Sequence, residues 1–205
     1  GNPDRLDALT PLLDGRARVH YLRDSGWTRV GDAAFGAFSR LDEGDPGACP
    51  WPDLVRVGLY HGPVRGCTTE NGWTFGAGKP MEDFAGCDVV LLGDIHKRQF
   101  VDGAAYAGSL VQQHYGETVD GHGVLVWEDG AWTGVDFPNP RAYVTLDVDD
   151  EGALVWPEAT PLTRANRVRV RTPWSATEAD RTRWTRACRG RKLGAPDWVR
   201  RSVAE

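Results

Sequence analysis

Short apolar runs separated by glycine, proline and polar clusters dominate this chain, and their lengths predict strands more often than helices. Val89–Leu92 is a continuous apolar run, which is typical of a buried strand. Leu54–His61 is a second apolar strand, and Arg167–Arg171 alternates Arg with Val, which predicts a strand with one apolar face. Further strands are expected at Val19–Leu22, Trp27–Val30, Ala34–Ser39 and Tyr143–Val148, with a turn at Ser25-Gly26 and a hairpin over Gly121–Phe137.

Two helices are expected, one near each end of the chain. Leu6–Leu13 predicts a short helix, and Ser175 with Glu178 forms a capping box that opens a helix running to about Cys188. Trp198–Val203 is expected to return as a strand, which would complete a β-α-β unit. Proline-containing stretches then divide the chain into a main domain (1–137), a linker with a connecting strand (138–163) and a small basic unit (164–205).

Charge is distributed unevenly along the 205 residues. The whole chain has a net charge of −5, yet the segment from Arg164 to Arg201 carries twelve Lys and Arg against three acidic residues. An acidic body suits cations and a basic unit suits phosphate backbones. A solvated Arg-rich face that merely balances the acidic domain is the alternative.

Two features that are absent from the sequence bear on the cellular compartment of the protein. No apolar run approaches the ~20 residues that a membrane-spanning helix needs, so no membrane association is expected. The four cysteines show no C-x-x-C spacing, which favours reduced thiols in a cytoplasmic protein.

Metal-binding side chains follow two of the predicted strands. Asp94 and His96 come directly after Val89–Leu92 and Gly93, and His61 ends the strand Leu54–His61. In extended backbone, residues i and i+2 project to the same side, so one cation could meet both Asp94 and His96. A solvated loop after the strand is the alternative for an isolated D-x-H, but two such strand ends favour a metal site.

Four segments in order carry a resemblance to a known family: LYHGPV ending the first of these strands, LLGDIHKRQ, AYAGSLVQQHYGE (105–117) and GHGVLVW (121–127). Together they resemble the second half of a calcineurin-like metallophosphoesterase, most closely the SbcD-type DNA repair exonucleases, which include phage recombination nuclease subunits. The resemblance runs from about residue 5 to 171 and more loosely to the end.

The resemblance implies an α/β fold, a partial two-sheet sandwich with outer helices and a small C-terminal β-α-β cap. It also implies a centre of two divalent cations, manganese or magnesium, at strand ends. His61 matches a metal-binding histidine, and Asp94 and His96 match a GHxH element whose first histidine is aspartate here. Carboxylate is a sound ligand for either metal. Catalytic residues stay unassigned.

The first metal-binding elements of the family, D-x-H and then GD, are expected to lie upstream of this sequence. No D-x-H followed by a GD element precedes His61 in a suitable strand setting. The chain is therefore interpreted as an N-terminally truncated part of the enzyme, inactive by itself. Residues 1–4, GNPD, allow two readings. They could be the GNHD element with proline for histidine, which would make Asn2 a ligand, or the loop that follows that element; the second is preferred.

The function implied by the resemblance is metal-dependent hydrolysis of DNA phosphodiesters in repair or recombination, with an SbcC-type ATPase as partner and a possible homodimer. The cap would hold DNA, and Arg167, Arg169 and Arg171 are the expected phosphate contacts. Two alternatives stay open: a metallophosphoesterase acting on small phosphodiesters or phosphoproteins, and a non-catalytic DNA-binding or scaffolding relative. His114, His20 and His122 are interpreted as structural or surface groups.

Overall fold

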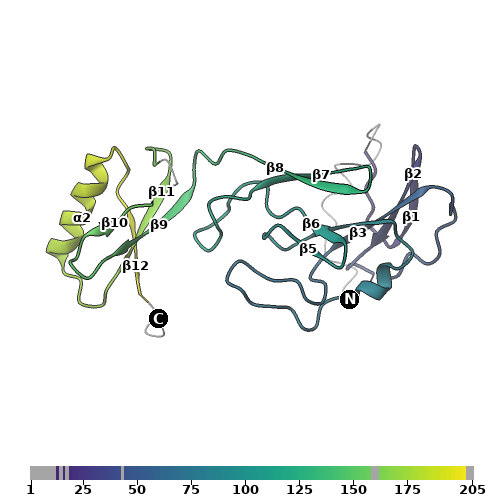
Figure 1. Cartoon of the computed structure of the whole chain (residues 1–205), viewed down its shortest axis with the longest axis horizontal. Helices are drawn as coiled ribbons and strands as arrows, with labels where there is room; N and C mark the ends of the chain where they lie inside the picture. Colours follow the sequence, from purple (N-terminus) through teal and green to yellow (C-terminus); the bar gives the residue numbers. More distant parts are fainter. Residues whose placement is uncertain (1–12, 14–15, 17–18, 43, 158–161, 202–205) are drawn as a thin grey trace. The chain divides into compact units, whose positions relative to one another are not determined.

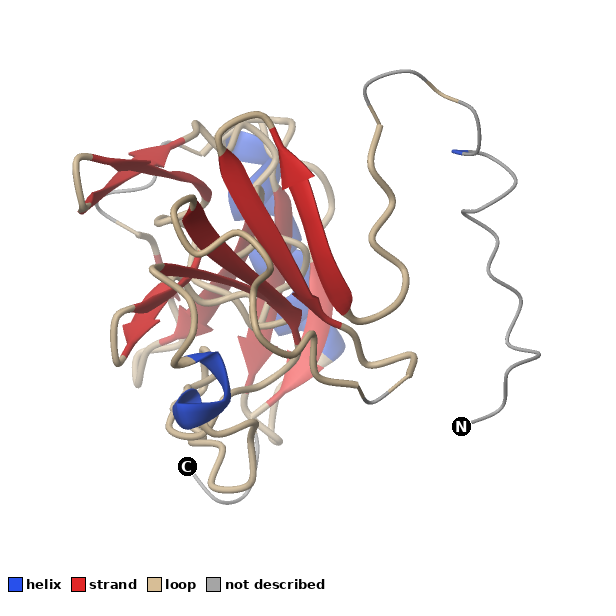
Figure 2. Cartoon of the chain, turned by 90° about the vertical axis from the view of Figure 1, so that its right-hand side faces the viewer, coloured by secondary structure: helices blue, strands red, loops and turns tan. Residues whose placement is uncertain are grey.

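The computed structural model describes residues 13, 16, 19–42, 44–157 and 162–201. The chain is mixed α/β, and most of its described regular secondary structure is strand (Figures 1 and 2). It divides into two compact units, residues 1–108 and 109–205. Among the described residues, no helix is both long enough and apolar enough to cross a membrane.

The first unit is built on one six-stranded sheet. Its strands are β1 (Gly26–Val30), β2 (Ala33–Phe38), β3 (Val55–His61), β4 (Val89–Gly93), β5 (Gln99–Val101) and β6 (Ala104–Tyr106), in the order β1-β2-β3-β4-β6-β5. Strands β2, β3, β4 and β6 are parallel, and the two edge strands are antiparallel to their neighbours. A short 3-10 helix, η1 (Met81–Phe84), precedes β4. Because the central strands are parallel, the ends of β3 and β4 lie at the same edge of the sheet.

The core of this unit lies on one face of the sheet. Phe38, Tyr60 and Leu92 come from three neighbouring strands, and the register places Tyr60 beside both of the others. They pack with Phe84 of η1, whose ring centroid is 4.6 Å from that of Phe38. The apolar runs of β3 and β4 thus form strands because their side chains cover this core.

Tyr106 fixes the loop that follows β3. Its side chain is fully buried, and its hydroxyl donates to the Gly62 carbonyl at 2.7 Å and accepts from the Val64 backbone N–H at 2.9 Å. Burial raises the pKa of this hydroxyl, so it stays protonated and can do both. The residues directly after His61 are therefore tied to β6.

Replacing Tyr106 by Phe should destabilise the first unit by about 1–3 kcal/mol, because a buried carbonyl and a buried N–H would lose their partner. Urea unfolding measures the loss. Tyr60→Phe is the control, since this side chain is half-buried. A Tyr106→Phe variant as stable as the control would show that the loop does not depend on this hydroxyl.

The second unit contains a hairpin and a four-stranded sheet. The hairpin is β7 (Gly123–Glu128) and β8 (Ala131–Asp136), and the sheet has the order β10-β9-β11-β12. Its strands are β9 (Tyr143–Val148), β10 (Leu154–Val155), β11 (Arg167–Thr172) and β12 (Asp197–Arg200). Helix α2 (Glu178–Gly190) connects β11 to the parallel strand β12, so the expected β-α-β unit is present.

One face of this sheet packs under α2. Val144, Leu146, Val168 and Val170 point to the same side and enclose Trp184 of the helix. The strand β9, expected in a linker, pairs directly with β11. The C-terminal unit is thus larger than residues 164–205, because β9 supplies half of the apolar face that α2 covers.

Local details differ from the expectations in three places. Residues 19–22 form no strand. The expected turn at Ser25-Gly26 is a bend at residues 24–25, directly before β1 begins at Gly26. The turn between β1 and β2 lies at Gly31-Asp32, where Gly31 adopts the left-handed conformation that a tight turn needs. The helix cap is Thr177 with Asp180 instead of Ser175 with Glu178. The helix expected at Leu6–Leu13 lies outside the described residues, apart from Leu13.

Candidate functional site

His61 and Asp94 meet at one edge of the first sheet. His61 ends β3 and is in register with Gly93, the last residue of β4, so Asp94 follows at the neighbouring strand end. The His61 Nε2 and Asp94 Oδ1 atoms are 3.9 Å apart, and the His61 side chain is 80% exposed. Parallel pairing of two apolar strands therefore brings an imidazole and a carboxylate together, both accessible from solvent.

The backbone at this point is specialised. A Cβ atom at Gly93 would lie 2.6 Å from Nδ1 of His61, so only glycine lets the imidazole lie over the end of β4. Asp94 itself has a φ of 86°, in the region that residues other than glycine rarely adopt. Such backbone strain is concentrated at functional sites, where the surrounding structure holds it in place.

Arg40, which follows β2, adds a positive charge to the pair. Its Nη1 lies 3.6 Å from Oδ2 of Asp94. Arg40 and His61 also line a groove of 690 Å³ whose walls include Leu59 and Leu91. The groove presents an imidazole and a guanidinium, and the Asp94 carboxylate lies beside both of them. This combination suits a ligand that carries both a cation and an anionic group. Sequence reasoning did not single out Arg40.

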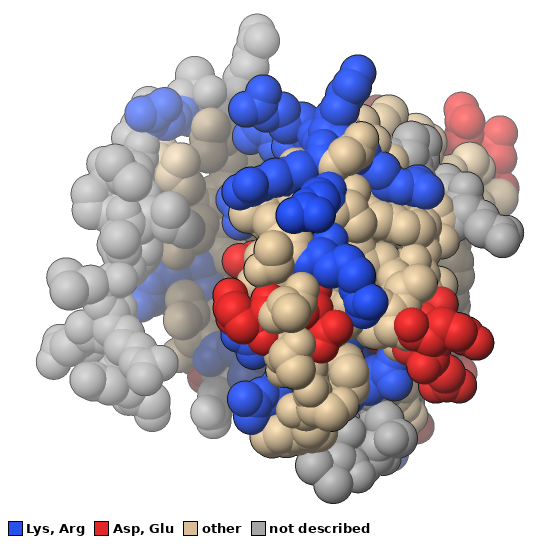
Figure 3. Space-filling model, turned by 90° about the vertical axis from the view of Figure 1, so that its left-hand side faces the viewer, with Lys and Arg blue, Asp and Glu red and all other residues tan. Residues whose placement is uncertain are grey.

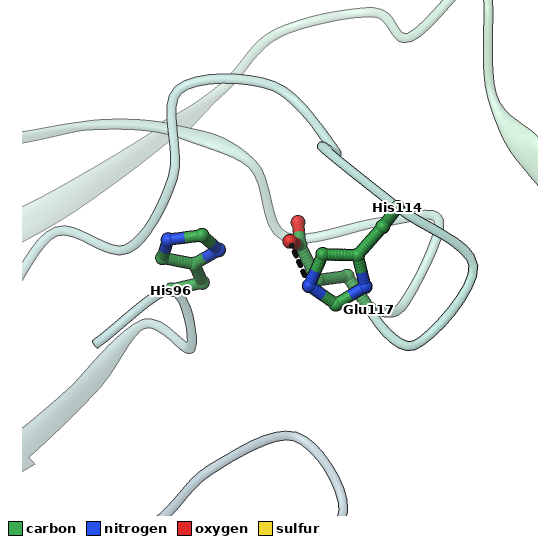
Figure 4. Close-up of side chains that lie close together, drawn as sticks. All are labelled: His96, His114 and Glu117. Carbon is green, nitrogen blue, oxygen red and sulfur yellow. Dashed lines mark ion pairs between the residues drawn. The ribbon is translucent and has the colours of Figure 1, made fainter. Parts of the chain in front are cut away.

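His96 comes two residues after Asp94 and lies beyond Ile95, which is buried in the core of the first unit. Its side chain is half-buried, and it is drawn in Figure 4. The structure pairs His61 with Asp94, while metal ligation by His96 stays a prediction.

The second unit holds a buried carboxylate that sequence reasoning missed. The Glu117 side chain is 1% exposed, and its Oε1 is 3.1 Å from Nε2 of His114 (Figure 4). Its Oε2 accepts hydrogen bonds from the Ser109 hydroxyl at 3.1 Å and from the Gln113 backbone N–H at 3.0 Å. The sequence signal for this contact was a histidine and a glutamate three residues apart in a tight turn.

His114 is held in one orientation by these contacts. The Gly116 backbone N–H donates to its Nδ1 at 3.0 Å, so in the neutral ring the proton lies on Nε2, facing Glu117. His114 and Glu117 offer donor atoms of the types that bind divalent cations. Within the second unit, however, both ring nitrogens are already engaged in fixing the turn.

A polar network extends from Glu117 through the rest of the turn. Ser109 also lies 3.0 Å from Nδ1 of His122, which is buried, and the other ring nitrogen lies 2.8 Å from the Thr118 carbonyl. Gln112 joins the turn to β9, because its amide nitrogen donates to the Tyr143 carbonyl and its amide oxygen accepts from the Tyr143 N–H. His122, interpreted as a structural or surface group, is buried in this network.

Arg167, Arg169 and Arg171 lie on the face of the second sheet that α2 does not cover. Arg171 forms an ion pair with Asp147 at 2.9 Å. Arg169 donates to the Thr145 hydroxyl and stacks on the Tyr115 ring, with 4.6 Å from Cζ to the ring centroid. Arg167 donates to the Tyr143 hydroxyl at 2.8 Å. These arginines therefore have partners inside the unit, and DNA would have to compete for them.

Tyr115 shows how closely this face is packed. Its hydroxyl donates to Asp197 of β12 at 3.0 Å. Burial, followed by this hydrogen bond to a carboxylate, raises the pKa of Tyr115 to about 12. The open face of the sheet is thus a set of Arg–Tyr and Arg–Asp contacts that stabilise the unit.

Comparisons with known proteins give one informative similarity. No family model matches the chain. The chain is similar to "Uncharacterized protein R555" of Acanthamoeba polyphaga mimivirus, with 33% identity over 168 residues. The match covers 73% of this chain and 12% of the viral protein, so the chain spans about an eighth of the length of that relative.

Proposed function

We propose that this chain supplies part of the two-cation site of an SbcD-type metallophosphoesterase that hydrolyses phosphodiester bonds of DNA. The observation that carries the proposal is the meeting of His61 and Asp94 at the ends of two adjacent parallel strands, 3.9 Å apart and open to solvent. A six-stranded sheet covered by its core on one face is compatible with one layer of a two-sheet sandwich.

The pair fits a divalent cation. Imidazole nitrogen and carboxylate oxygen bind such ions at about 2.0–2.2 Å, so two donors of one ion lie up to roughly 4 Å apart. Oxygen and nitrogen donors together suit manganese, and an extra carboxylate suits magnesium. The observed separation therefore needs only small side-chain rotations to admit an ion, and His96 is proposed as a further ligand.

Two bound cations would supply an activated water and would neutralise the charge of the phosphodiester. His61 and Asp94 would hold and orient a cation. The guanidinium of Arg40 lies beside Asp94, where it can contact a phosphate oxygen. In the described part of the chain, Asp94 is the one carboxylate within 4.0 Å of His61. Because two-cation chemistry needs a further bridging carboxylate, we propose that the chain by itself binds metal weakly and cleaves nothing.

The rest of the proposal follows the family resemblance. It comprises two manganese ions, a cytoplasmic DNA repair or recombination role, an SbcC-type ATPase partner and a possible homodimer. The concentration of arginine in the second unit favours DNA over small phosphodiesters as the substrate, since polyanions gain most from many cationic contacts.

Mn²⁺ binding to the full chain tests the proposal. His61→Ala should weaken Mn²⁺ binding at least tenfold, measured by electron paramagnetic resonance titration of free Mn²⁺, because it removes one of the paired donors. His20→Ala is the matched control, as His20 is an exposed histidine outside the strand ends. Equal Mn²⁺ affinity of the two variants would contradict the site, and Mn²⁺-dependent cleavage of plasmid DNA by this chain would contradict its proposed inactivity.

A further inference from the structure

The outer side of α2 carries a stripe of cationic side chains. Arg181, Arg186 and Arg189 line the same groove of 430 Å³, together with Glu178, Thr182, Thr185 and Trp198 of β12. The helix positions that line the groove are related by intervals of three and four residues, so they lie on one face of the helix. The groove runs along the boundary between the helix and the edge strand of the sheet. Its guanidinium and hydroxyl groups can donate hydrogen bonds, and Glu178 in the first turn of the helix is the one carboxylate among its lining residues.

A second groove continues this surface beyond the end of the helix. It has a volume of 600 Å³ and is lined by Arg164, Arg189, Arg191 and Lys192. Arg189 lines both grooves, so the two form one track along the second unit. Figure 3 views the molecule from the α2 side and shows Lys and Arg side chains gathered there. We call these two joined grooves the α2 track.

The cations of the α2 track are available for a ligand. Arg164, Arg186 and Arg189 are exposed, and within the described residues no carboxylate lies within ion-pair distance of any of them. The arginines of β11 differ, since Arg171 is paired with Asp147 and the others donate to side chains of β9. Of the two faces of the unit, the helix side therefore holds the unsatisfied positive charge.

The spacing of the track matches a nucleic-acid strand. From Arg181 to Arg189 the helix rises roughly 12 Å at 1.5 Å per residue, and a DNA strand carries one phosphate per about 3.4 Å of axis. Three arginines on this face therefore span a few successive phosphates. A protein partner would be expected to bury an apolar centre, whereas Trp198 is the one aromatic residue that lines the first groove.

We propose that the α2 track is the DNA-backbone binding surface of this protein, and that the β11 arginines instead stabilise the sheet. The assignment deepens the proposed function by naming the surface that holds DNA, and it rests on that function for the identity of the polyanion. Contacts are to phosphate oxygens, so binding is independent of base sequence and weakens steeply with salt.

Binding of the full chain to a fluorescein-labelled 30-base-pair duplex, and to one of its single strands, tests the track in EDTA by fluorescence anisotropy. EDTA separates this test from the proposed hydrolysis, which needs metal. The variant R164Q/R186Q/R189Q should weaken duplex binding at least tenfold at 0.1 M salt. It should also reduce the slope of log K against log salt by about 2–3, since each duplex phosphate contact contributes about 0.9.

Three controls decide the outcome. R29Q/R65Q/R141Q removes the same charge from exposed arginines elsewhere and should change duplex affinity less than twofold. R164K/R186K/R189K should keep most of the affinity, and circular dichroism confirms that each variant is folded. Equal losses in the two glutamine variants would overturn the proposal, as would poly-glutamate displacing the chain from DNA better than unlabelled duplex does. A larger loss for single strand than for duplex would assign the track to single-stranded DNA.

Discussion

Replacing Glu117 by Ala is expected to destabilise the second unit by about 1–3 kcal/mol, the range for removing one partner from buried hydrogen-bonding groups. The carboxylate is 1% exposed, and its loss would remove an acceptor from the buried Ser109 hydroxyl and from the partly buried Gln113 N–H. Glu117→Gln should cost less, because its amide keeps the volume and one acceptor oxygen.

Amide hydrogen exchange measures this effect within the second unit. The amides of β9 and β11 should lose protection in Glu117→Ala, because Gln112 joins the same turn to Tyr143 of β9. Glu151→Ala is the control, since Glu151 is exposed in the turn between β9 and β10. A loss below 1 kcal/mol in Glu117→Ala would mean that water or a rearranged turn replaces the carboxylate.

Replacing Asp94 by Gly or by Ala should each reduce Mn²⁺ affinity at least tenfold, because both remove the carboxylate beside His61. The two variants should differ in stability, however. Since residue 94 has φ of 86°, Gly should be more stable there than Ala by about 1 kcal/mol. Metal titration and urea unfolding of the same two variants distinguish the role of Asp94 as a metal ligand from the effect of its strained backbone on stability.

Asp102 provides the matched control for Asp94. It also has positive φ, 46°, and lies in the turn between β5 and β6. Asp102→Gly and Asp102→Ala should show the same order of stability with unchanged Mn²⁺ affinity. If the variants at position 94 bind Mn²⁺ as well as those at position 102, the carboxylate of Asp94 is no ligand and the metal proposal fails.

The strands could be predicted from the sequence because their apolar patterns are local. The runs before His61 and Asp94 correspond to β3 and β4, and the alternation of Arg with Val corresponds to β11. The cap of α2 was ambiguous, since Ser175 and Thr177 are each followed three residues later by an acidic residue. Only the observed hydrogen bonds between Thr177 and Asp180 decide between them.

The candidate site was predictable where it depends on strand order and not where it depends on contacts between loops. His61 and Asp94 meet because β3 and β4 are parallel neighbours. The approach of Arg40 and the left-handed backbone of Asp94 depend on loop conformation, which no periodicity encodes. The role of the β11 arginines was equally hidden, because the pairing of Arg171 with Asp147 follows from the register of β11 and β9.

The separation of the buried apolar side chains into two clusters bears on how the chain folds. One cluster is drawn from residues 38–106 and the other from residues 142–193, with no side chain in common. Each unit thus contains its own apolar core, and domains of this kind fold separately. A newly made chain can therefore complete the sheet that carries His61 and Asp94 before the arginine-rich sheet has been synthesised.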